Sequence, residues 1–158
     1  MAGAQADEIA DAPTGPVLIA YDGCELAEFA IERAGQELAT PREALVLTVW
    51  QPGDVGFVPT GGRHVRAAAA DEVKEAAEET AAFGASLAQR VGFNARSMAA
   101  EAAPTWRGIV EVAEQEQASS IVIGSHRKSG LIGHLGGSVA AATLEHFPGA
   151  VLIVRRGT

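Results

Sequence analysis

In Val17-Leu18-Ile19-Ala20-Tyr21-Asp22-Gly23 an unbroken apolar run ends in an abrupt turn, and this pattern indicates the class of fold. A run of this length, bounded by Pro16 on one side and by the turn on the other, is typical of a parallel strand buried on both faces. Beyond it the apolar residues recur at three- and four-residue steps, beginning with Leu26, Phe29 and Ala30, and glutamates stand between them. This spacing predicts an amphipathic helix directly after the strand.

The alternation of strand and helix continues to the end of the chain. Further strands are predicted at Leu45–Trp50, weakly around Asn94–Met98, at Ser120–Gly124 and at Ala150–Val154, and further helices at Asp71–Val91, Pro104–Gln117 and Ser138–His146. Such an alternation requires a parallel sheet with right-handed crossovers and helices on both faces. We therefore expect an α/β fold, a single doubly wound domain with a five-stranded parallel sheet and four helices.

Length and composition indicate one globular domain. The chain has 158 residues, of which 47% are hydrophobic and 20% charged, and this is enough for one sizeable core. Residues 1–15 mix Ala, Gly, Asp and Pro without a period, so we expect a disordered N-terminal tail followed by a domain over 16–158. Residues 53–63 are rich in Gly and Pro and are predicted to form a loop, for which a lid over a site is one interpretation.

Charge and cysteine usage exclude several classes of protein. A formal charge of −8 argues against a general nucleic-acid binder. Cys24 is the single cysteine, which excludes an internal disulfide and a multi-cysteine zinc site. No segment is long and apolar enough to span a membrane, and the first 14 residues lack the basic residues of a secretory signal, so we expect a cytoplasmic protein with no membrane partner.

The segment from Gly124 to Ser138 is the most unusual part of the chain. It holds five of the 18 glycines and runs from the end of a predicted strand to the start of a predicted helix. Glycines let the backbone approach an anion, helix-start amides point toward it, and Arg127 and Lys128 add positive charge. Phosphate binding therefore fits this segment. A simple long turn with solvated basic side chains fits the same composition, and both interpretations stay open.

Other polar residues have structural as well as functional interpretations. Asp22 at a strand end suits a turn or helix cap as well as a ligand contact. Cys24 lies near a helix start, where a thiol pKa can be lowered, but the sequence identifies no base beside it, so a reactive role is not favoured. His126 and His134 can reach a phosphate but have no metal-ligand spacing. The glutamates between 72 and 79 are most simply a solvated helix face.

These residues resemble those of the universal stress protein family over nearly all of Val17 to Arg155. The resemblance rests on the strand followed by Asp22-Gly23, on Val49 near the end of the second strand, on Gly124-Ser125-His126 leading to Gly137-Ser138, and on the apolar terminal strand. ATP-binding members carry Gly, two residues, Gly, nine residues, Gly and then Ser or Thr. Gly124, Gly137 and Ser138 match this motif, whereas Arg127 stands at its second glycine.

The resemblance implies a sheet with strand order 3-2-1-4-5 and a site for ATP, or for ADP or AMP, with Mg²⁺ bound through the nucleotide. By that analogy Asp22 serves the ribose and the metal, Ala20 and Val49 flank the adenine, and Gly124, Gly137 and Ser138 hold the phosphates. The full candidate set is Ala20, Asp22, Val49, Gly124, Ser125, His126, Arg127, Lys128, Gly130, Gly137, Ser138 and Val139.

The favoured function is that of a cytoplasmic ATP-binding stress-response protein acting as a regulatory homodimer. Its dimer is predicted to form through the terminal strand Ala150–Val154, which would otherwise leave an apolar edge unpaired, and a regulatory protein is a further candidate partner. No catalytic constellation is evident, because the Ser138 hydroxyl has no recognisable base, so any ATP hydrolysis would be slow and incidental.

Three other functions compete with this one. One is a dimeric scaffold that has lost nucleotide binding through Arg127. Another is an adenylating enzyme of the nucleotide α-hydrolase group, which would carry Ser-Gly-Gly followed by Asp-Ser where this chain has Asp22-Gly23-Cys24-Glu25. The last is a phosphoacceptor receiver domain, which needs an Asp at the end of the third strand, where Ser97 to Ala100 offers none.

Overall fold

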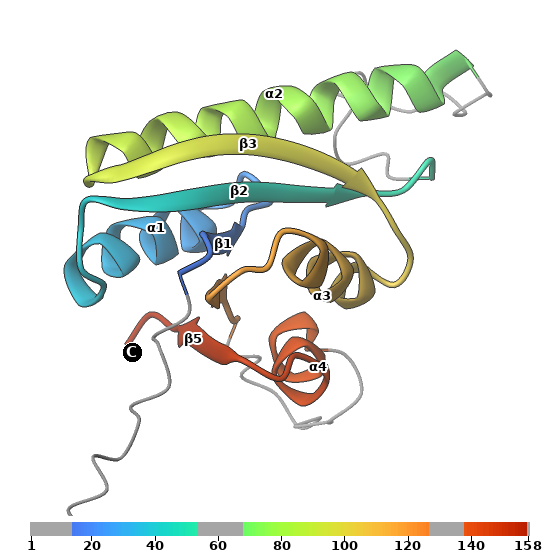
Figure 1. The fold of residues 1–158 in the computed structure, drawn as a ribbon. Helices are drawn as coiled ribbons and strands as arrows, with labels where there is room; N and C mark the ends of the chain where they lie inside the picture. Colours follow the sequence, from blue (N-terminus) through green and yellow to red (C-terminus); the bar gives the residue numbers. More distant parts are fainter. Residues whose placement is uncertain (1–13, 54–67, 127–137, 158) are drawn as a thin grey trace, which may run out of the picture.

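Five parallel strands alternate with four helices in the computed structural model, which describes residues 14–53, 68–126 and 138–157 (Figure 1). In chain order the elements are β1 (Val17–Ala20), α1 (Glu25–Glu37), β2 (Arg42–Trp50), α2 (Ala68–Arg90), β3 (Phe93–Glu101), α3 (Thr105–Gln115), β4 (Ser120–Gly124), α4 (Val139–His146) and β5 (Ala150–Val154). The sheet order is β3-β2-β1-β4-β5, which confirms the expected α/β class and topology.

The apolar run that opens the domain forms the central strand. Val17 lies opposite Ala44 of β2 on one side and opposite Ser120 of β4 on the other. Val17, Leu18 and Ile19 are fully buried, as expected for a strand with neighbours on both sides and helices on both faces. The chain first winds outward from β1 to β3 and then crosses back to β4, so the strand order reverses between β1 and β4.

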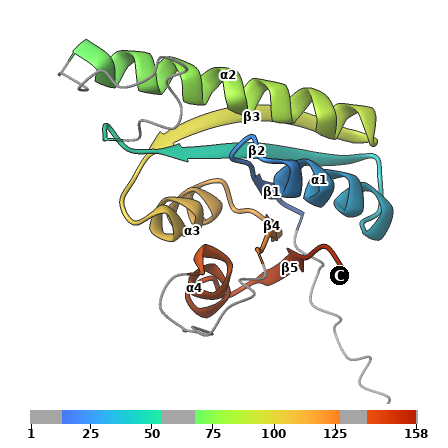
Figure 2. The same ribbon diagram turned by 180° about the vertical axis from the view of Figure 1, so that it is seen from behind.

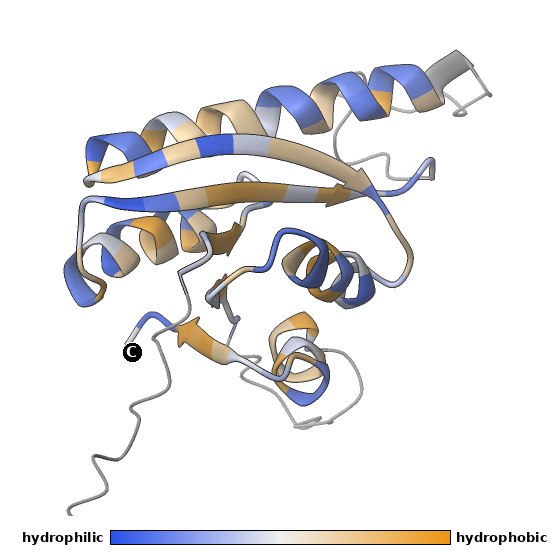
Figure 3. Cartoon of the chain, in the orientation of Figure 1, coloured by the Kyte–Doolittle hydropathy of each residue, from blue (hydrophilic) through white to orange (hydrophobic). Residues whose placement is uncertain are grey.

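One face of the sheet is covered by α1 and α2, and the other by α3 and α4 (Figures 1 and 2). Alternate strand residues point to opposite faces, so Val17 and Ile19 join the apolar cluster under α1 and α2, whereas Leu18 joins the cluster under α3 and α4. Figure 3 shows hydrophobic colours on β1, along the middle of β2 and on β5. The two apolar layers form the core of the frame that carries the candidate site.

The structure corrects several predicted element boundaries. β3 spans nine residues, four more than the weak strand predicted around Asn94–Met98, and it pairs with β2 from Phe93 to Glu101. Its apolar signal is weak because β3 is an edge strand with exposed polar residues. β2 begins at Arg42, before the predicted Leu45. Pairing between neighbouring strands, which local hydropathy does not record, extends both elements.

Helix ends differ from the predictions for local reasons. α3 ends at Gln115, and Gln117 adopts a left-handed φ of 52°, which a helix cannot contain. α4 begins at Val139, because Ser138 is its N-cap. α2 begins at Ala68, before the predicted Asp71. The predicted tail, up to residue 13, and most of the predicted loop over 53–63 lie outside the described residues. None of the described helices is long and apolar enough to cross a membrane.

Candidate functional site

The turn that follows β1 lies at the carboxyl edge of the sheet, beside the point where the strand order reverses. The Asp22 carboxylate accepts a hydrogen bond from the backbone N–H of Cys24 (Oδ1 to N, 3.0 Å). Gly23 between them has a φ of +83°, in the left-handed region that favours glycine. Cys24 then serves as the N-cap residue of α1. Of the two interpretations of Asp22, the turn role is therefore present in the structure.

Thr48 of β2 holds the start of this turn. Its hydroxyl donates to the backbone carbonyl of Tyr21 (2.8 Å), and the Tyr21 N–H donates to the carbonyl of Leu47 (2.9 Å). Burial raises the pKa of the Tyr21 hydroxyl to about 12, and the carboxylate of Glu28, 3.5 Å from that hydroxyl, adds to the rise. The Tyr21 side chain is therefore neutral at physiological pH and acts as part of the core.

The turn after β1 meets the end of β4 through two side chains. The Cys24 sulfur lies 4.0 Å from Nε2 of His126. Burial raises the pKa of the Cys24 thiol, and its hydrogen bond with Asp22 adds to the rise. The lowered pKa that a helix start can impose on a thiol is thus not found. Cys24 is a protonated thiol at neutral pH, which agrees with a structural interpretation.

Gly124 lets the end of β4 approach α1 closely. A Cβ at this position would lie 3.0 Å from Cγ of Leu26, closer than ordinary van der Waals contact. The next residue, Ser125, donates its backbone N–H to the carbonyl of Val154 in β5 (2.8 Å). The first glycine of the motif therefore has a packing role in this structure.

The N-terminus of α4 is capped, and its C-terminus is held against α3. The Ser138 hydroxyl accepts from the backbone N–H of Ala141 (3.1 Å), which satisfies one of the free amides of the first turn. At the other end, the ring of His146 stacks on that of Trp106 with centroids 4.1 Å apart. These contacts orient a helix whose N-terminus carries partial positive charge, which favours an anion.

Three small apolar candidates line the same face of the sheet. Ala20, Val49 and Val139 are all half-buried, and all pack against the apolar cluster under α3 and α4. Val49 is close to α3, since a Cβ on Gly108 would lie 3.1 Å from its nearer methyl group. A half-buried surface of short apolar side chains suits one face of a planar base.

The structure thus assembles most of the predicted residues at one edge. These are Ala20, Asp22, Val49, Gly124, Ser125, His126, Ser138 and Val139, which all lie at the carboxyl ends of strands or at the start of α4. Arg127, Lys128, Gly130, His134 and Gly137 lie outside the described residues. Sequence reasoning missed Thr48, although a lone hydroxyl residue in the apolar run Leu45–Trp50 is a usable signal.

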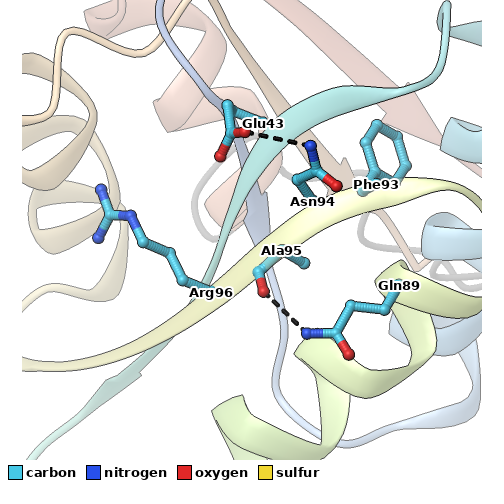
Figure 4. A pocket seen from close by; sticks show the side chains of 6 residues that line it. All are labelled: Glu43, Gln89, Phe93, Asn94, Ala95 and Arg96. Carbon is cyan, nitrogen blue, oxygen red and sulfur yellow. Dashed lines mark hydrogen bonds between the residues drawn. The ribbon is translucent and has the colours of Figure 1, made fainter.

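A surface pocket lies at the opposite, amino-terminal end of the sheet, where β3 begins (Figure 4). Its polar side chains are engaged with nearby groups. Asn94 donates to Glu43 (3.2 Å), Gln89 donates to the carbonyl of Ala95 (2.9 Å), and Arg96 forms an ion pair with Glu116. Because these groups satisfy one another, the carboxyl edge is the stronger candidate site.

This fold and this arrangement of turns agree with a family comparison. The chain belongs to the universal stress protein family, whose model matches residues 14–155. The match covers every described strand and helix and ends just beyond β5.

Solved structures of similar fold extend the comparison. The hypothetical protein MJ0577 is 24% identical with a TM-score of 0.66, over 92% of this chain and 99% of that one. A universal stress protein in complex with cAMP is 22% identical with a TM-score of 0.65, over 90% and 98%. The universal stress protein from Archaeoglobus fulgidus in complex with dAMP is 23% identical with a TM-score of 0.57, over 89% and 98%. At these identities the likeness establishes the fold.

Proposed function

We propose that the chain binds an adenine nucleotide, with ATP as the first candidate, at the carboxyl edge of its sheet, and that it acts as a regulatory dimer in the cytoplasm. The observation that carries the proposal is the convergence of the turn after β1, the end of β4 and the N-terminus of α4 at the reversal of strand order. Ligands of doubly wound folds bind at such a point. The cAMP and dAMP complexes of structurally similar proteins support the same ligand class.

The residues at this edge fit the parts of a nucleotide. Ala20 and Val49 offer an apolar surface to the adenine. Asp22 is exposed and accepts from Cys24 in the turn, and a carboxylate has further lone pairs for a ribose hydroxyl or for Mg²⁺ bound with the phosphates. The start of α4, capped by Ser138, suits the phosphates. Bound Mg²⁺ would neutralise phosphate charge, and the chain itself would orient the ligand.

The nucleotide-binding function and its alternative differ in the role that they give to Arg127. An arginine is long enough to direct its head toward a phosphate and pair with it, so we expect it to support binding. The alternative is a dimeric scaffold without nucleotide, in which Arg127 blocks the phosphates. Two observations favour that alternative: Arg127 occupies a glycine position of the motif, and both Asp22 and Ser138 already have structural hydrogen bonds.

Two measurements decide between them. Mass spectrometry of the supernatant from heat-denatured protein identifies any nucleotide that copurifies. Titration calorimetry then compares the parent with Arg127→Gly, for which we expect binding about 5- to 30-fold weaker, an effect that high salt narrows. If the parent binds no adenine nucleotide and Arg127→Gly restores binding, the scaffold function is correct.

The dimer is proposed to form through β5, the last strand of the sheet. β5 pairs with β4 on one side, and Val151, Leu152 and Ile153 are only half-buried, so its outer edge offers an apolar strand to a second copy. The carbonyl of Val154 faces β4, where it accepts from Ser125, so the backbone of Ile153 faces outward.

Ile153→Pro therefore removes an N–H from the outer edge and leaves the pairing with β4 intact. We expect the parent to sediment as a dimer at micromolar concentration, and the variant to sediment as a folded monomer. A parent that sediments strictly as a monomer would contradict the proposed dimer.

A further inference from the structure

Thr48 is a buried polar residue in an otherwise apolar part of β2. Its neighbours Leu47 and Trp50 are buried, and Thr48 itself has no exposed surface. A hydroxyl without a partner in such a place would destabilise the fold by the cost of its desolvation. The hydroxyl instead donates a hydrogen bond to the carbonyl of Tyr21 (2.8 Å), directly after the neighbouring strand β1.

The Tyr21 carbonyl stands directly before the turn that carries Asp22. Tyr21 is the first residue after β1, and its ring packs against α2 so closely that a Cβ on Gly84 would lie 2.6 Å from the ring. The turn therefore begins at a residue that is held in two ways. The ring of Tyr21 packs against α2, and its carbonyl accepts a hydrogen bond from Thr48. Asp22 and Cys24 follow within three residues and are linked by their own hydrogen bond.

We propose that Thr48 is a positioning residue of the nucleotide site, which fixes the backbone at Tyr21 and so the direction in which the Asp22 carboxylate leaves the sheet. This inference rests on the proposed function, since it assigns Asp22 to the ligand. Thr48 does not touch the ligand. Its contribution is to keep the turn after β1 in one conformation before the ligand arrives, which lowers the entropy lost on binding.

The chain offers a matched control for this role. Thr143 of α4 is also fully buried, but its hydroxyl has no hydrogen-bond partner among the described residues. Thr→Val is close to isosteric and removes a hydroxyl from each position. Thr48→Val removes the hydrogen bond to Tyr21, whereas Thr143→Val removes a hydroxyl that bonds to none of the residues that the structure describes. Thr48→Ser keeps the hydroxyl and serves as the rescue variant.

Calorimetric titration with ATP and Mg²⁺ tests the role in ligand binding. We expect Thr48→Val to weaken affinity about tenfold, in line with the loss of one buried hydrogen bond, and Thr48→Ser and Thr143→Val to bind as the parent does. Equal affinities for the parent and Thr48→Val would overturn the inference. A loss of affinity in Thr48→Ser as large as in Thr48→Val would also overturn it, because the hydroxyl would then not be responsible.

Amide hydrogen exchange without nucleotide provides a second, independent measurement. The Cys24 N–H is held by Asp22, so a loosened turn should raise its exchange rate in Thr48→Val and leave it unchanged in Thr143→Val. If the parent binds no adenine nucleotide, the proposed function fails, and the exchange rate alone decides whether Thr48 orders the turn. An unchanged Cys24 rate in Thr48→Val would overturn that part as well.

Discussion

The two ends of the sheet use their polar side chains differently. At the amino-terminal end, several side chains bond to one another across elements, as Arg42 does with Ser119 (2.8 Å) and Asn94 with Glu43, although Gln89 bonds to the carbonyl of Ala95. At the carboxyl-terminal end, three polar side chains bond to backbone groups, and the one side-chain pair described there, Cys24 with His126, is 4.0 Å apart. Asp22, Thr48 and Ser138 each hold a backbone atom near a strand end or helix start.

This difference indicates which end is built to receive a ligand. Polar side chains that pair with each other satisfy their own hydrogen-bonding capacity and leave little for a ligand. Side chains that hold the backbone instead shape turns and helix starts, whose remaining amides and carboxylate oxygens are available. Substitutions at one end should therefore change nucleotide affinity, and substitutions at the other end should change it little.

The largest effect is expected where α2 meets Tyr21. A Cβ on Gly84 would lie 2.6 Å from the Tyr21 ring and 2.8 Å from a methyl group of Val46, and both neighbours are buried. Gly84→Ala should therefore lower the free energy of unfolding by about 2 kcal/mol, despite the better helix propensity of alanine. The measurement is urea denaturation followed by circular dichroism.

Gly35→Ala is the control for this substitution. Its Cβ would lie 2.8 Å from the Cβ of Val91 and 3.1 Å from the Val91 carbonyl oxygen, so the contact falls on one half-buried residue after the end of α2 and not on two fully packed core residues. A loss of stability in Gly35→Ala equal to that in Gly84→Ala would show that the packing at Tyr21 is not exceptional.

The next effect concerns the pH dependence of stability through Tyr21. Its pKa is raised to about 12 in the folded chain from an unfolded value near 10, so the neutral hydroxyl contributes stability below pH 10 that is lost as the pH rises toward 12. Between pH 9 and pH 11 the free energy of unfolding should fall by about 1.4 kcal/mol through Tyr21. Tyr21→Phe should remove this part of the pH dependence.

Tyr21 is the single tyrosine of the chain, so its ionisation can be followed by ultraviolet absorbance without interference from other tyrosines. An absorbance titration with a midpoint near pH 10 in the folded protein would contradict the buried environment.

Removal of the α4 cap is expected to have a smaller effect on stability. Ser138→Ala removes the hydroxyl that accepts from the backbone N–H of Ala141. The free energy of unfolding, measured by thermal or urea denaturation, should therefore fall by about 1 kcal/mol. Ser138→Asp keeps the cap and adds negative charge where the proposed phosphates bind. This variant should therefore retain stability and lose nucleotide affinity, and normal affinity would place the phosphates elsewhere.

The smallest effect is expected at the amino-terminal end. Arg96 forms an ion pair with Glu116, and the Arg96 side chain is about half exposed, so Arg96→Ala should change the free energy of unfolding by at most about 0.5 kcal/mol. Nucleotide affinity should not change. A drop in affinity comparable to that of the edge variants would show that the two ends are coupled.

Most of the fold was predictable from local patterns. β1, β4 and β5 are short apolar runs, and α1 and α2 show helical spacing, because burial on one or both faces selects apolar residues at fixed periods. The length of β3 was underestimated because few of its residues are buried. Its residues are exposed or half-buried apart from Phe93, so its length follows from pairing with β2.

The candidate site divides in the same way. The placement of Asp22, Gly124 and Ser138 at strand ends or at a helix start was predictable from local patterns, since it follows from where each apolar run stops. The roles of Thr48 and Gly84 were not predictable, because both residues contact Tyr21, which is distant in the chain. A local pattern records the burial of a residue, but a contact between elements depends on how strands and helices pack.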